Sequence, residues 1–451
     1  MERYIVSTII LVVIFMQSCT QFLDVKPDSG MAIPDNVKDL QALLDNEDRS
    51  ILTYPESGDI ASDYYFMEEA DWLSRSLDAR NVYVWDANAQ YLRDWSNAYQ
   101  KIFAANVVLE NVDDASLGNL QESDRVRVKG TAYFIRGWNY FHLSQLFCPY
   151  YSIDATDSPY GLPLKITADI NEPIERATLQ ETYEHIFQDL TQAAASLPDR
   201  VDINVRPSKA TAYAALARVS LVIGDYNNAL DFANKSLALE STLLDYNTVD
   251  PIPRQPFQIL NQDVLFHAVI VSSSGVHAQS RAFADTVLIE KYDNDDLRKE
   301  LFFREEQNGY YRFRGTYEGG TIALFGGISI PEIYLIKAEC HARLGQDDLA
   351  TEALNLLRVN RYRDRAIPEI GTVIGDSLLE LILEEREKEL LFRGGIRWSD
   401  LRRLNQDSRF AKTLSRKIGD NYYELKPNDP RYTFLIPFTV VQQSGLIQNP
   451  R

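Results

Sequence analysis

The chain has 451 residues, of which 45% are hydrophobic and 25% are charged. It carries 46 basic and 65 acidic side chains, so its formal net charge is −19. This surplus of acid repels phosphate backbones and anionic lipid headgroups, which argues against a nucleic-acid partner and against a polybasic membrane-binding face. The length and composition are typical of a globular protein with a large core, long enough for two lobes.

The N-terminus carries a short apolar segment that ends close to a cysteine. Residues 5–16 are apolar apart from two hydroxyl side chains. As a helix this segment would be about 18 Å long, too short for a hydrocarbon core of about 30 Å. It predicts a signal peptide over residues 1–18, and it resembles the bacterial lipoprotein signal, in which Cys19 would be the lipidated first residue of the mature chain. A simple secreted protein and an uncleaved membrane anchor are the alternatives.

Two further cysteines, Cys148 and Cys340, lie within or near the ends of predicted helices. In an oxidising compartment they could form a disulfide, but they are far apart in the sequence and nothing fixes their distance. We expect two buried, reduced thiols.

Helical periodicity dominates the next part of the chain. Apolar and aromatic residues recur at three- and four-residue steps over residues 94–112 and 126–147. A third segment opens with Thr178 and Glu181 at the spacing of a capping box. A fourth helix is expected to start at Ser208.

Two segments share a pattern in which an alanine stands seven residues before a glycine and another alanine five residues after it. These residues are Ala217, Gly224 and Ala229 in the first segment, and Ala338, Gly345 and Ala350 in the second. Small residues there allow two antiparallel helices to approach closely around a short turn, as in a tetratricopeptide hairpin. Two unrelated helix–glycine–helix turns are the alternative.

Residues 245–330, between these two segments, lose the helical rhythm and are rich in Pro, Gly, Tyr and Asp. Within them, residues 263–271 (DVLFHAVIV) predict a strand. Residues 308–320 (NGYYRFRGTYEGG) predict an exposed aromatic hairpin or loop.

A run of charge, Glu384–Glu389 (EEREKE), raises the question of metal or acid–base chemistry. Within a helix, Glu384 and Glu385 both reach Lys388, so pairing of charges along the helix is the simpler interpretation. The arginines that follow are expected to bind these acids or helix ends; they are Arg393, Arg397, Arg402 and Arg403.

A second acidic stretch, YDNDDLRKE, could hold calcium through Asp293, Asp295 and Asp296. A calcium loop needs glycine at its sixth position and glutamate at its twelfth, where this chain has Arg298 and Arg304. An aspartate that caps the start of a helix explains the stretch more simply.

The sequence holds none of the usual catalytic motifs. The five histidines are scattered, and there is no zinc-binding His-Glu-x-x-His pair, nucleophile elbow, phosphate loop or dinucleotide turn. We therefore predict no catalytic residue, no metal and no cofactor. A glycoside hydrolase is a remote alternative, because it needs only two carboxylates about 5 to 9 Å apart.

Eight segments, in order and suitably spaced, resemble the SusD/RagB family of nutrient-binding outer-membrane lipoproteins of Bacteroidetes. They start at FLDVKP (22–27), continue through WSNAYQKIFAANVVLE, GTAYFIRGWNYFHLSQLF and TYEHIFQDLTQAAASLP, and then through PSKATAYAALARVSLVIGDYNNAL. The C-terminal segments are EIYLIKAECHARLG, ILEEREKELLFRGGIRWSDLRRLN and YTFLIPFTVVQQSGLIQNPR. One departure is Pro331, where members often have a small residue; proline is tolerated in the first turn of a helix, so we expect a local effect only.

The resemblance implies a mainly α fold, with four tetratricopeptide-like helical hairpins packed against an irregular, loop-rich lobe with a few short strands. It implies an N-terminal SusD-like helical domain over residues 19–244 and a C-terminal SusD/RagB domain over residues 245–451. It also implies attachment to the cell outer membrane through the lipid, facing the outside. The implied partner is a SusC-like TonB-dependent transporter barrel, for which the protein would act as a lid. Oligosaccharides are the expected cargo, with peptides as the alternative.

Aromatic side chains are the candidates for ligand contact, because sugar rings stack on Trp and Tyr while acidic groups bind hydroxyls. Two stretches outside the helical cores offer them. The candidates are Asp63, Tyr64, Tyr65, Trp72 and Trp85 in the first stretch, and Tyr310, Tyr311 and Tyr317 in the second. Tyr64, Trp72 and Tyr311 are preferred, because charged or glycine-rich neighbours suggest exposure. For each of these residues, plain packing in the core is the alternative to ligand contact. For the protein as a whole, a purely structural tetratricopeptide scaffold is the alternative.

Overall fold

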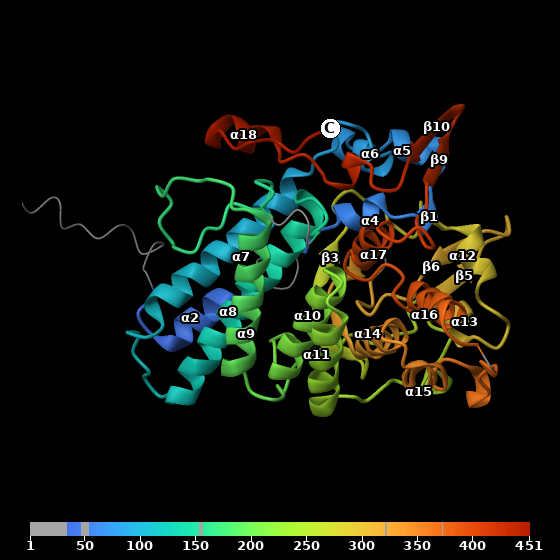
Figure 1. Cartoon of the computed structure of the whole chain (residues 1–451), viewed down its shortest axis with the longest axis horizontal. Helices are drawn as coiled ribbons and strands as arrows, with labels where there is room; N and C mark the ends of the chain where they lie inside the picture. The colour runs from blue at the N-terminus through green and yellow to red at the C-terminus, as the bar shows by residue number, and fades with distance from the viewer. Residues whose placement is uncertain (1–33, 47–53, 153–156, 321–322, 372) are drawn as a thin grey trace, which may run out of the picture.

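A computed structural model describes residues 34–46, 54–152, 157–320, 323–371 and 373–451. Most of the regular structure is helical, and the strands are short (Figure 1). The predicted fold class, helical hairpins packed against a lobe rich in loops, is confirmed. The signal peptide, Cys19 and the FLDVKP segment lie outside the described residues.

Long helices that follow one another in the chain build one side of the molecule (Figure 1). They are α2 (Val37–Leu44), α7 (Leu92–Asn111), α8 (Glu122–Phe147), α9 (Leu179–Ser196), α10 (Lys209–Val222) and α11 (Tyr226–Leu239). Helices α7 to α11 each pack against the next in the chain, and α11 packs against α14 (Ile330–Arg343). The predicted helix starts are confirmed: Thr178 and Glu181 form a capping box at α9, and Ser208 caps α10.

The remaining helices lie mostly in the C-terminal half. They are α4 (Ser57–Ala61), α5 (Glu69–Leu73), α6 (Leu77–Tyr83), α12 (Thr286–Glu290), α13 (Leu297–Phe302), α15 (Asp347–Arg358), α16 (Asp376–Glu389), α17 (Ile396–Leu404) and α18 (Phe438–Ser444). Pro331 lies in the first turn of α14, where proline is tolerated. Single 3₁₀ turns lie at Tyr246–Thr248, Arg363–Arg365 and Pro430–Tyr432.

Within the described ranges the strands form five two-stranded antiparallel sheets. The pairs are β1 (Tyr65–Phe66) with β4 (Phe283–Ala284), β2 (Val264–Phe266) with β8 (Ile328–Ser329), β3 (Val269–Val271) with β7 (Ala323–Phe325), β5 (Phe303–Glu305) with β6 (Tyr311–Phe313), and β9 (Leu414–Ile418) with β10 (Asn421–Leu425). The strand predicted over residues 263–271 is therefore two strands, β2 and β3, interrupted at His267 and Ala268.

The two predicted helical hairpins are confirmed as α10–α11 and α14–α15. Their turns contain Gly224 at φ 81° and Gly345 at φ 71°, a backbone conformation that only glycine adopts readily. The four pattern alanines are buried, so the absence of larger side chains lets each helix pair approach closely.

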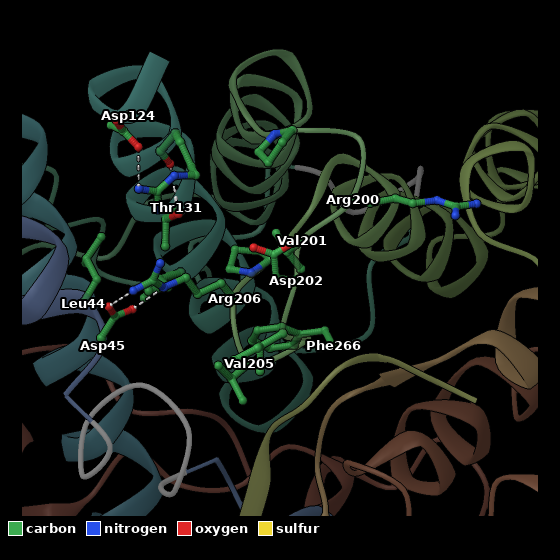
Figure 2. Close-up of a pocket in the computed structure, with 15 residues that line it drawn as sticks. Leu44, Asp45, Asp124, Thr131, Arg200, Val201, Asp202, Val205, Arg206 and Phe266 are labelled. Atoms are coloured by element: carbon green, nitrogen blue, oxygen red, sulfur yellow. Dashed lines mark hydrogen bonds and ion pairs between the residues drawn. The ribbon is translucent and has the colours of Figure 1, made fainter. Parts of the chain in front are cut away.

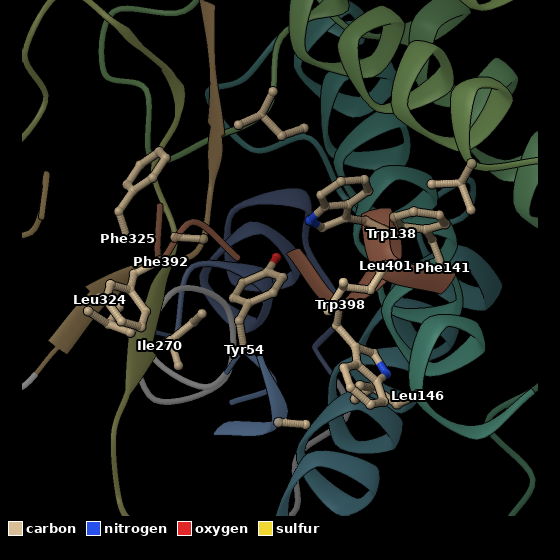
Figure 3. Close-up of a cluster of buried hydrophobic side chains, with 14 of the residues drawn as sticks. Tyr54, Trp138, Phe141, Leu146, Ile270, Leu324, Phe325, Phe392, Trp398 and Leu401 are labelled. Atoms are coloured by element: carbon tan, nitrogen blue, oxygen red, sulfur yellow. The ribbon is translucent and has the colours of Figure 1, made fainter. Parts of the chain in front are cut away.

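The main hydrophobic core joins the helical side to the C-terminal half. Around Tyr54 it gathers Trp138 and Phe141 from α8 and Trp398 from α17 (Figure 3). Trp398 stacks on Phe434 with ring centroids 5.4 Å apart. Because α8 and α17 lie far apart in the sequence, this packing ties the two halves together.

A buried ionic core lies in the C-terminal half, formed by Asp263, Asp296, Arg298, Arg361, Glu385, Lys388 and Glu389. Arg361 binds Glu389 at 3.0 Å and Asp263 at 2.8 Å. The prediction for the EEREKE run is confirmed for Glu385, which binds Lys388 at 3.2 Å. It is wrong for Glu384, which is partly exposed and forms no ion pair with another described residue, because Lys388 pairs with Glu385 and Asp296.

The arginines after this run have different partners. As predicted, Arg397 binds Glu387 of this run at 3.0 Å, and Arg402 donates to backbone carbonyls at the C-terminal end of α8. Arg403 binds carboxylates outside the run, those of Glu339 and Asp400. For Arg393 the prediction is wrong: its guanidinium lies 3.5 Å from the centre of the Tyr317 ring, and its nitrogens form no hydrogen bond within the described part of the chain. Aromatic faces surround this guanidinium and take the place of a carboxylate.

Three smaller predictions also have outcomes. Asp296 caps α13 through the backbone N–H of Arg298, as the helix-start interpretation required. Cys148 and Cys340 are buried and free. Across the residues that the structure describes, no helix is both long enough and apolar enough to cross a bilayer.

Candidate functional site

The two aromatic stretches singled out in the sequence meet in space. Strand β1 pairs with β4, with Phe66 opposite Phe283. The tip of the β5–β6 hairpin lies against this pair, because the rings of Phe66 and Tyr310 are 5.1 Å apart at their centroids. Segments more than two hundred residues apart in the chain therefore share one surface.

We call Phe66, Phe283 and Tyr310 the ring cluster. Phe66 stacks on Phe283 at 5.5 Å, and Phe283 lies 5.4 Å from Tyr310. Phe283 is buried, Phe66 is partly exposed and Tyr310 is 40% exposed. The buried ring thus supports two rings that reach solvent, an arrangement suited to stacking against a flat apolar ligand face.

Arginine borders the ring cluster. The Arg312 guanidinium lies 3.8 Å from the centre of the Phe283 ring and donates to the carbonyl of Ala282. Trp72, on the short helix α5 that follows β1, is partly buried, and Arg80 lies 5.4 Å from its ring centre. The Trp72 indole N–H donates to the Arg80 carbonyl at 3.4 Å, which holds the ring in place.

Four of the predicted contact residues lie in the core instead. Tyr64, Tyr65, Trp85 and Tyr317 are between 0% and 3% exposed, so their rings cannot stack against a ligand in this conformation. The exposure expected for Tyr64 is wrong, because the side chains of Phe392 and Arg397 cover it. The neighbouring charges that suggested exposure are themselves largely buried in ion pairs.

Hydrogen bonds inside the protein occupy the polar groups of the other three buried residues. Tyr65 donates to the carbonyl of Ile60 and the Trp85 indole N–H donates to Ala61. The Tyr317 hydroxyl donates to Asp263, a member of the ionic core. Core packing explains all three.

Asp63 is also engaged by the protein itself. Its carboxylate accepts two hydrogen bonds from Arg397, at 2.7 and 2.8 Å, and one from Lys412 at 2.8 Å. Burial alone would raise the pKa of Asp63, but the two cations outweigh it and lower this pKa. Its oxygens therefore bind side chains of the protein where the sequence suggested sugar hydroxyls.

Tyr310 and Trp72 remain the predicted residues best placed for a ligand, with Tyr311 partly buried against the core beside them. Arg312 lies in the second predicted stretch, whereas the sequence analysis missed Phe66 and Phe283. Strand alternation was a usable signal for Phe66, because its neighbour Tyr65 faces the core. Only the pairing of β1 with β4 could reveal Phe283.

Four carboxyl groups with raised pKa values bear on catalysis, those of Asp59, Asp94, Asp263 and Asp285. Asp263 binds Arg361 in the ionic core, and Asp285 caps α12 through the backbone N–H of Leu288. Burial raises the pKa values of Asp59 and Asp94 to about 7. Both side chains are buried and accept hydrogen bonds from backbone N–H groups, Asp59 from Gly395 and Asp94 from Ser57. A surface substrate has no access to them. Across the described ranges, no group of three or more His, Cys, Asp or Glu side chains could hold a metal ion.

A cavity of about 690 Å³ lies elsewhere, between the end of α2, the first half of α8 and the loop from α9 to α10 (Figure 2). Arg206 and Asp45 pair across it at 2.5 Å, and Arg127 pairs with Asp124. Its aromatic lining residue, Phe266, is 2% exposed. This cavity therefore offers paired charges and aliphatic walls, with no ring free for stacking.

Comparison with known proteins agrees with the fold. A family model described as starch-binding and associating with the outer membrane matches residues 21–221, and the model of the SusD family matches residues 330–443. The SusD-like protein P2 of Formosa agariphila is 26% identical over 444 residues, covering 83% of each chain.

Solved structures show the same fold. A SusD superfamily protein from Bacteroides thetaiotaomicron superposes with a TM-score of 0.74 at 21% identity, covering 92% of this chain and 100% of that one. A laminarin-binding SusD-like protein superposes with a TM-score of 0.66 at 18% identity, covering 92% and 97%. These two structures show the fold. The two family matches, over residues 21–221 and 330–443, together with the Formosa agariphila relative, show that the chain belongs to the SusD/RagB family.

Proposed function

We propose that this protein binds an oligosaccharide on the surface formed by the ring cluster and Trp72. The observation that carries the proposal is the convergence of β1, β4 and the β5–β6 hairpin, which leaves Phe66 and Tyr310 open to solvent beside polar side chains. Pyranose rings present flat C–H faces that stack on such rings. Membership of a family described by starch binding, with a laminarin-binding protein among its structural neighbours, supports this ligand class.

We further propose that the protein is attached to the outer membrane through lipid on Cys19 and delivers its ligand to a SusC-like TonB-dependent transporter, acting as its lid. The lipoprotein-like signal and the family's described association with the outer membrane support this role. The protein itself would supply affinity and selectivity, and it would carry out no bond chemistry.

Calorimetry on residues 20–451 tests the binding proposal. The protein is titrated with maltose-, laminarin-, xylan-, uronate- and sulfate-containing oligosaccharides and with short peptides. We expect one glycan class to bind and Tyr310→Ala to weaken that binding at least tenfold, because the substitution removes an exposed ring. Phe103→Ala is the matched control, since Phe103 is 42% exposed on α7 while Tyr310 is 40% exposed.

The outcomes separate the alternatives. If only peptides bind, the cargo is a peptide and not a glycan. A glycan that binds equally well to Tyr310→Ala would move the site away from the ring cluster. Co-purification of the lipidated protein with an outer-membrane barrel tests the transporter partnership separately, and recovery of the protein alone from gently solubilised membranes would count against it.

A further inference from the structure

Two arginines beside the ring cluster point at one patch of backbone. Arg75 follows α5 and donates through Nη1 to the carbonyl of Ser274 at 3.2 Å. Arg281 donates through Nη1 to the carbonyl of Gly275 at 3.3 Å. A β-carbon placed on Gly275 would lie 2.8 Å from Nη1 of Arg75 and 3.2 Å from Nη1 of Arg281. Because both Nη1 atoms lie close to this one point, the two guanidinium groups are near neighbours.

One carboxylate accompanies this pair of like charges. Asp71 lies 3.8 Å from Nε of Arg281, and both side chains are 33% exposed. The other hydrogen bonds of Arg75 go to neutral oxygens, namely the Asp71 carbonyl and the Ser74 hydroxyl. Partial burial and, next, the charge of Arg281 lower the pKa of Arg75. Two guanidiniums held this close repel each other unless an anion joins them.

The same imbalance recurs across the ring cluster. Glu306 is shared between Arg304 at 2.6 Å and Arg312 at 3.5 Å, so one carboxylate again serves two guanidiniums. Two other nearby acids have contacts of their own. Glu305 interacts with Tyr311, and Glu69 points at the turn between β9 and β10, where a β-carbon on Gly419 would lie 2.5 Å from its Oε1. Within the described residues Arg75 forms no ion pair with a carboxylate, although the chain has a net charge of −19.

These arginines are continuous with the ring cluster. Arg281 stands two residues before Phe283, and Arg312 packs on the ring of Phe283. On the other strand, Phe66 precedes α5 by two residues, and α5 leads directly to Arg75. A ligand several sugar units long that lies on Phe66 and Tyr310 would therefore reach the guanidinium pair.

We propose that the oligosaccharide bound by this protein is anionic, and that Arg75 and Arg281 together bind its carboxylate or sulfate group while a neighbouring sugar ring stacks on the ring cluster. This inference rests on the proposed function and specifies the ligand class. Guanidinium groups match carboxylate and sulfate oxygens in a forked geometry, and the hydrogen bonds of Arg75 and Arg281 do not use all of their N–H donors. The ligand's negative charge would neutralise the repulsion between them.

The test compares charged and neutral oligosaccharides on residues 20–451. The uronate probes are oligogalacturonates, with fully methyl-esterified oligogalacturonates as their neutral match; the sulfate probes are carrageenan oligosaccharides, with desulfated ones as their match. Malto- and laminari-oligosaccharides represent neutral glycans. We expect the tightest ligand to be anionic and its affinity to fall as NaCl is raised from 50 to 500 mM. Whether uronate or sulfate binds distinguishes the two sources of charge.

The variants are Arg75→Gln and Arg281→Gln, which keep a polar, hydrogen-bonding side chain and remove the charge. Each should weaken binding of the anionic ligand at least tenfold while leaving the unfolding temperature unchanged. Arg75→Lys, which keeps the charge, should lose less affinity than Arg75→Gln. Arg200→Gln is the control, because Arg200 is an exposed arginine on the loop between α9 and α10. A structural role alone would lower the unfolding temperature and affect charged and neutral ligands equally.

Each contrary outcome has a distinct meaning. If the tightest ligand is neutral and Tyr310→Ala abolishes its binding, the proposed function stands and this inference falls. If an anionic ligand binds but neither glutamine variant weakens it, the guanidinium pair is not its site and the inference also falls. If no oligosaccharide binds, both proposals fail on these probes.

Discussion

The hairpin α10–α11 and the buried ionic core of the C-terminal half achieve burial in opposite ways. In the hairpin, Ala217 and Ala229 are buried, and small side chains bring the two helices together. In the ionic core, Arg361 and Arg298 are completely buried and are surrounded by carboxylates. One region depends on shape, and the other on the matching of charges.

The difference teaches where each region is sensitive to substitution. An apolar helix interface tolerates a change in proportion to the volume added or removed. A buried ion pair adds little net stability over a hydrophobic pair, but the loss of one partner leaves the other charge buried and uncompensated. The ionic core should therefore be robust as a whole and fragile at each member.

The largest effect is expected for Arg361→Met. The substitution leaves Glu389 and Asp263 without their shared cation, and it should lower the free energy of unfolding by about 3 to 5 kcal/mol. Arg365→Met is the control, since Arg365 is 63% exposed in its pair with Asp245 and should change stability by less than about 1 kcal/mol. Urea unfolding measures both. Equal effects would show that burial does not set the sensitivity.

The stability of the protein should depend on pH through Asp59, which lies where the two halves meet. This residue of α4 accepts a hydrogen bond from Gly395 at the start of α17. Burial, with smaller contributions from Asp94 and Glu56, raises the pKa of Asp59 from 3.8 to about 7. Its protonation therefore favours the folded state, fully so below about pH 4, and this stabilisation is lost as the pH rises through 7. Unfolding free energy should fall between pH 5 and pH 8.

Asp59→Asn mimics the protonated acid, so it should remove part of that fall, on the order of 2 to 4 kcal/mol across the window. The rest of the fall in stability should remain in this variant, because the pKa of Asp94 is shifted in the same direction. Asp78→Asn is the control, because Asp78 is exposed in the first turn of α6, and it should leave the pH profile unchanged. A variant profile parallel to that of the wild type would show that Asp59 is not the group responsible.

A smaller effect is expected where α8 packs on α9. A β-carbon on Gly137 would lie 2.8 Å from the β-carbon of Asp189, whose carboxylate binds Arg136. Gly137→Ala should destabilise the protein by about 1 to 3 kcal/mol, because the clash exceeds the gain in helix propensity. Gly320→Ala is the control, since nothing lies within 4 Å of its β-carbon position. Thermal unfolding gives the comparison, and a more stable Gly137→Ala would mean that the helices can move apart freely.

The smallest effect concerns a helix start. Thr178→Ala removes the side chain that accepts from the backbone N–H of Glu181 and should cost about 1 kcal/mol. Gln180→Ala changes an exposed side chain in the same turn without touching the cap, and its effect should be within about 0.5 kcal/mol. Chemical denaturation resolves the two variants. If they destabilise equally, general helix propensity explains the loss and the cap contributes little.

Local patterns were sufficient to predict much of the helical side. The caps at Thr178 and Ser208 and the hairpin glycines Gly224 and Gly345 act over a few residues, so the chain itself carries the signal. The binding surface was harder. Tyr64 and Tyr310 both stand beside polar residues, yet one is 2% exposed and the other 40%, because exposure depends on which distant segment covers each ring.

The sequence by itself determined the family, the helical hairpins and the two chain segments that supply exposed rings, since these depend on residue types at short spacing. Only the tertiary structure decided that Phe66, Phe283 and Tyr310 meet, and that Arg75 and Arg281 share one patch at Gly275. Pairing between distant strands and the matching of buried charges depend on the packing of the whole molecule. No pattern within a single segment specifies them.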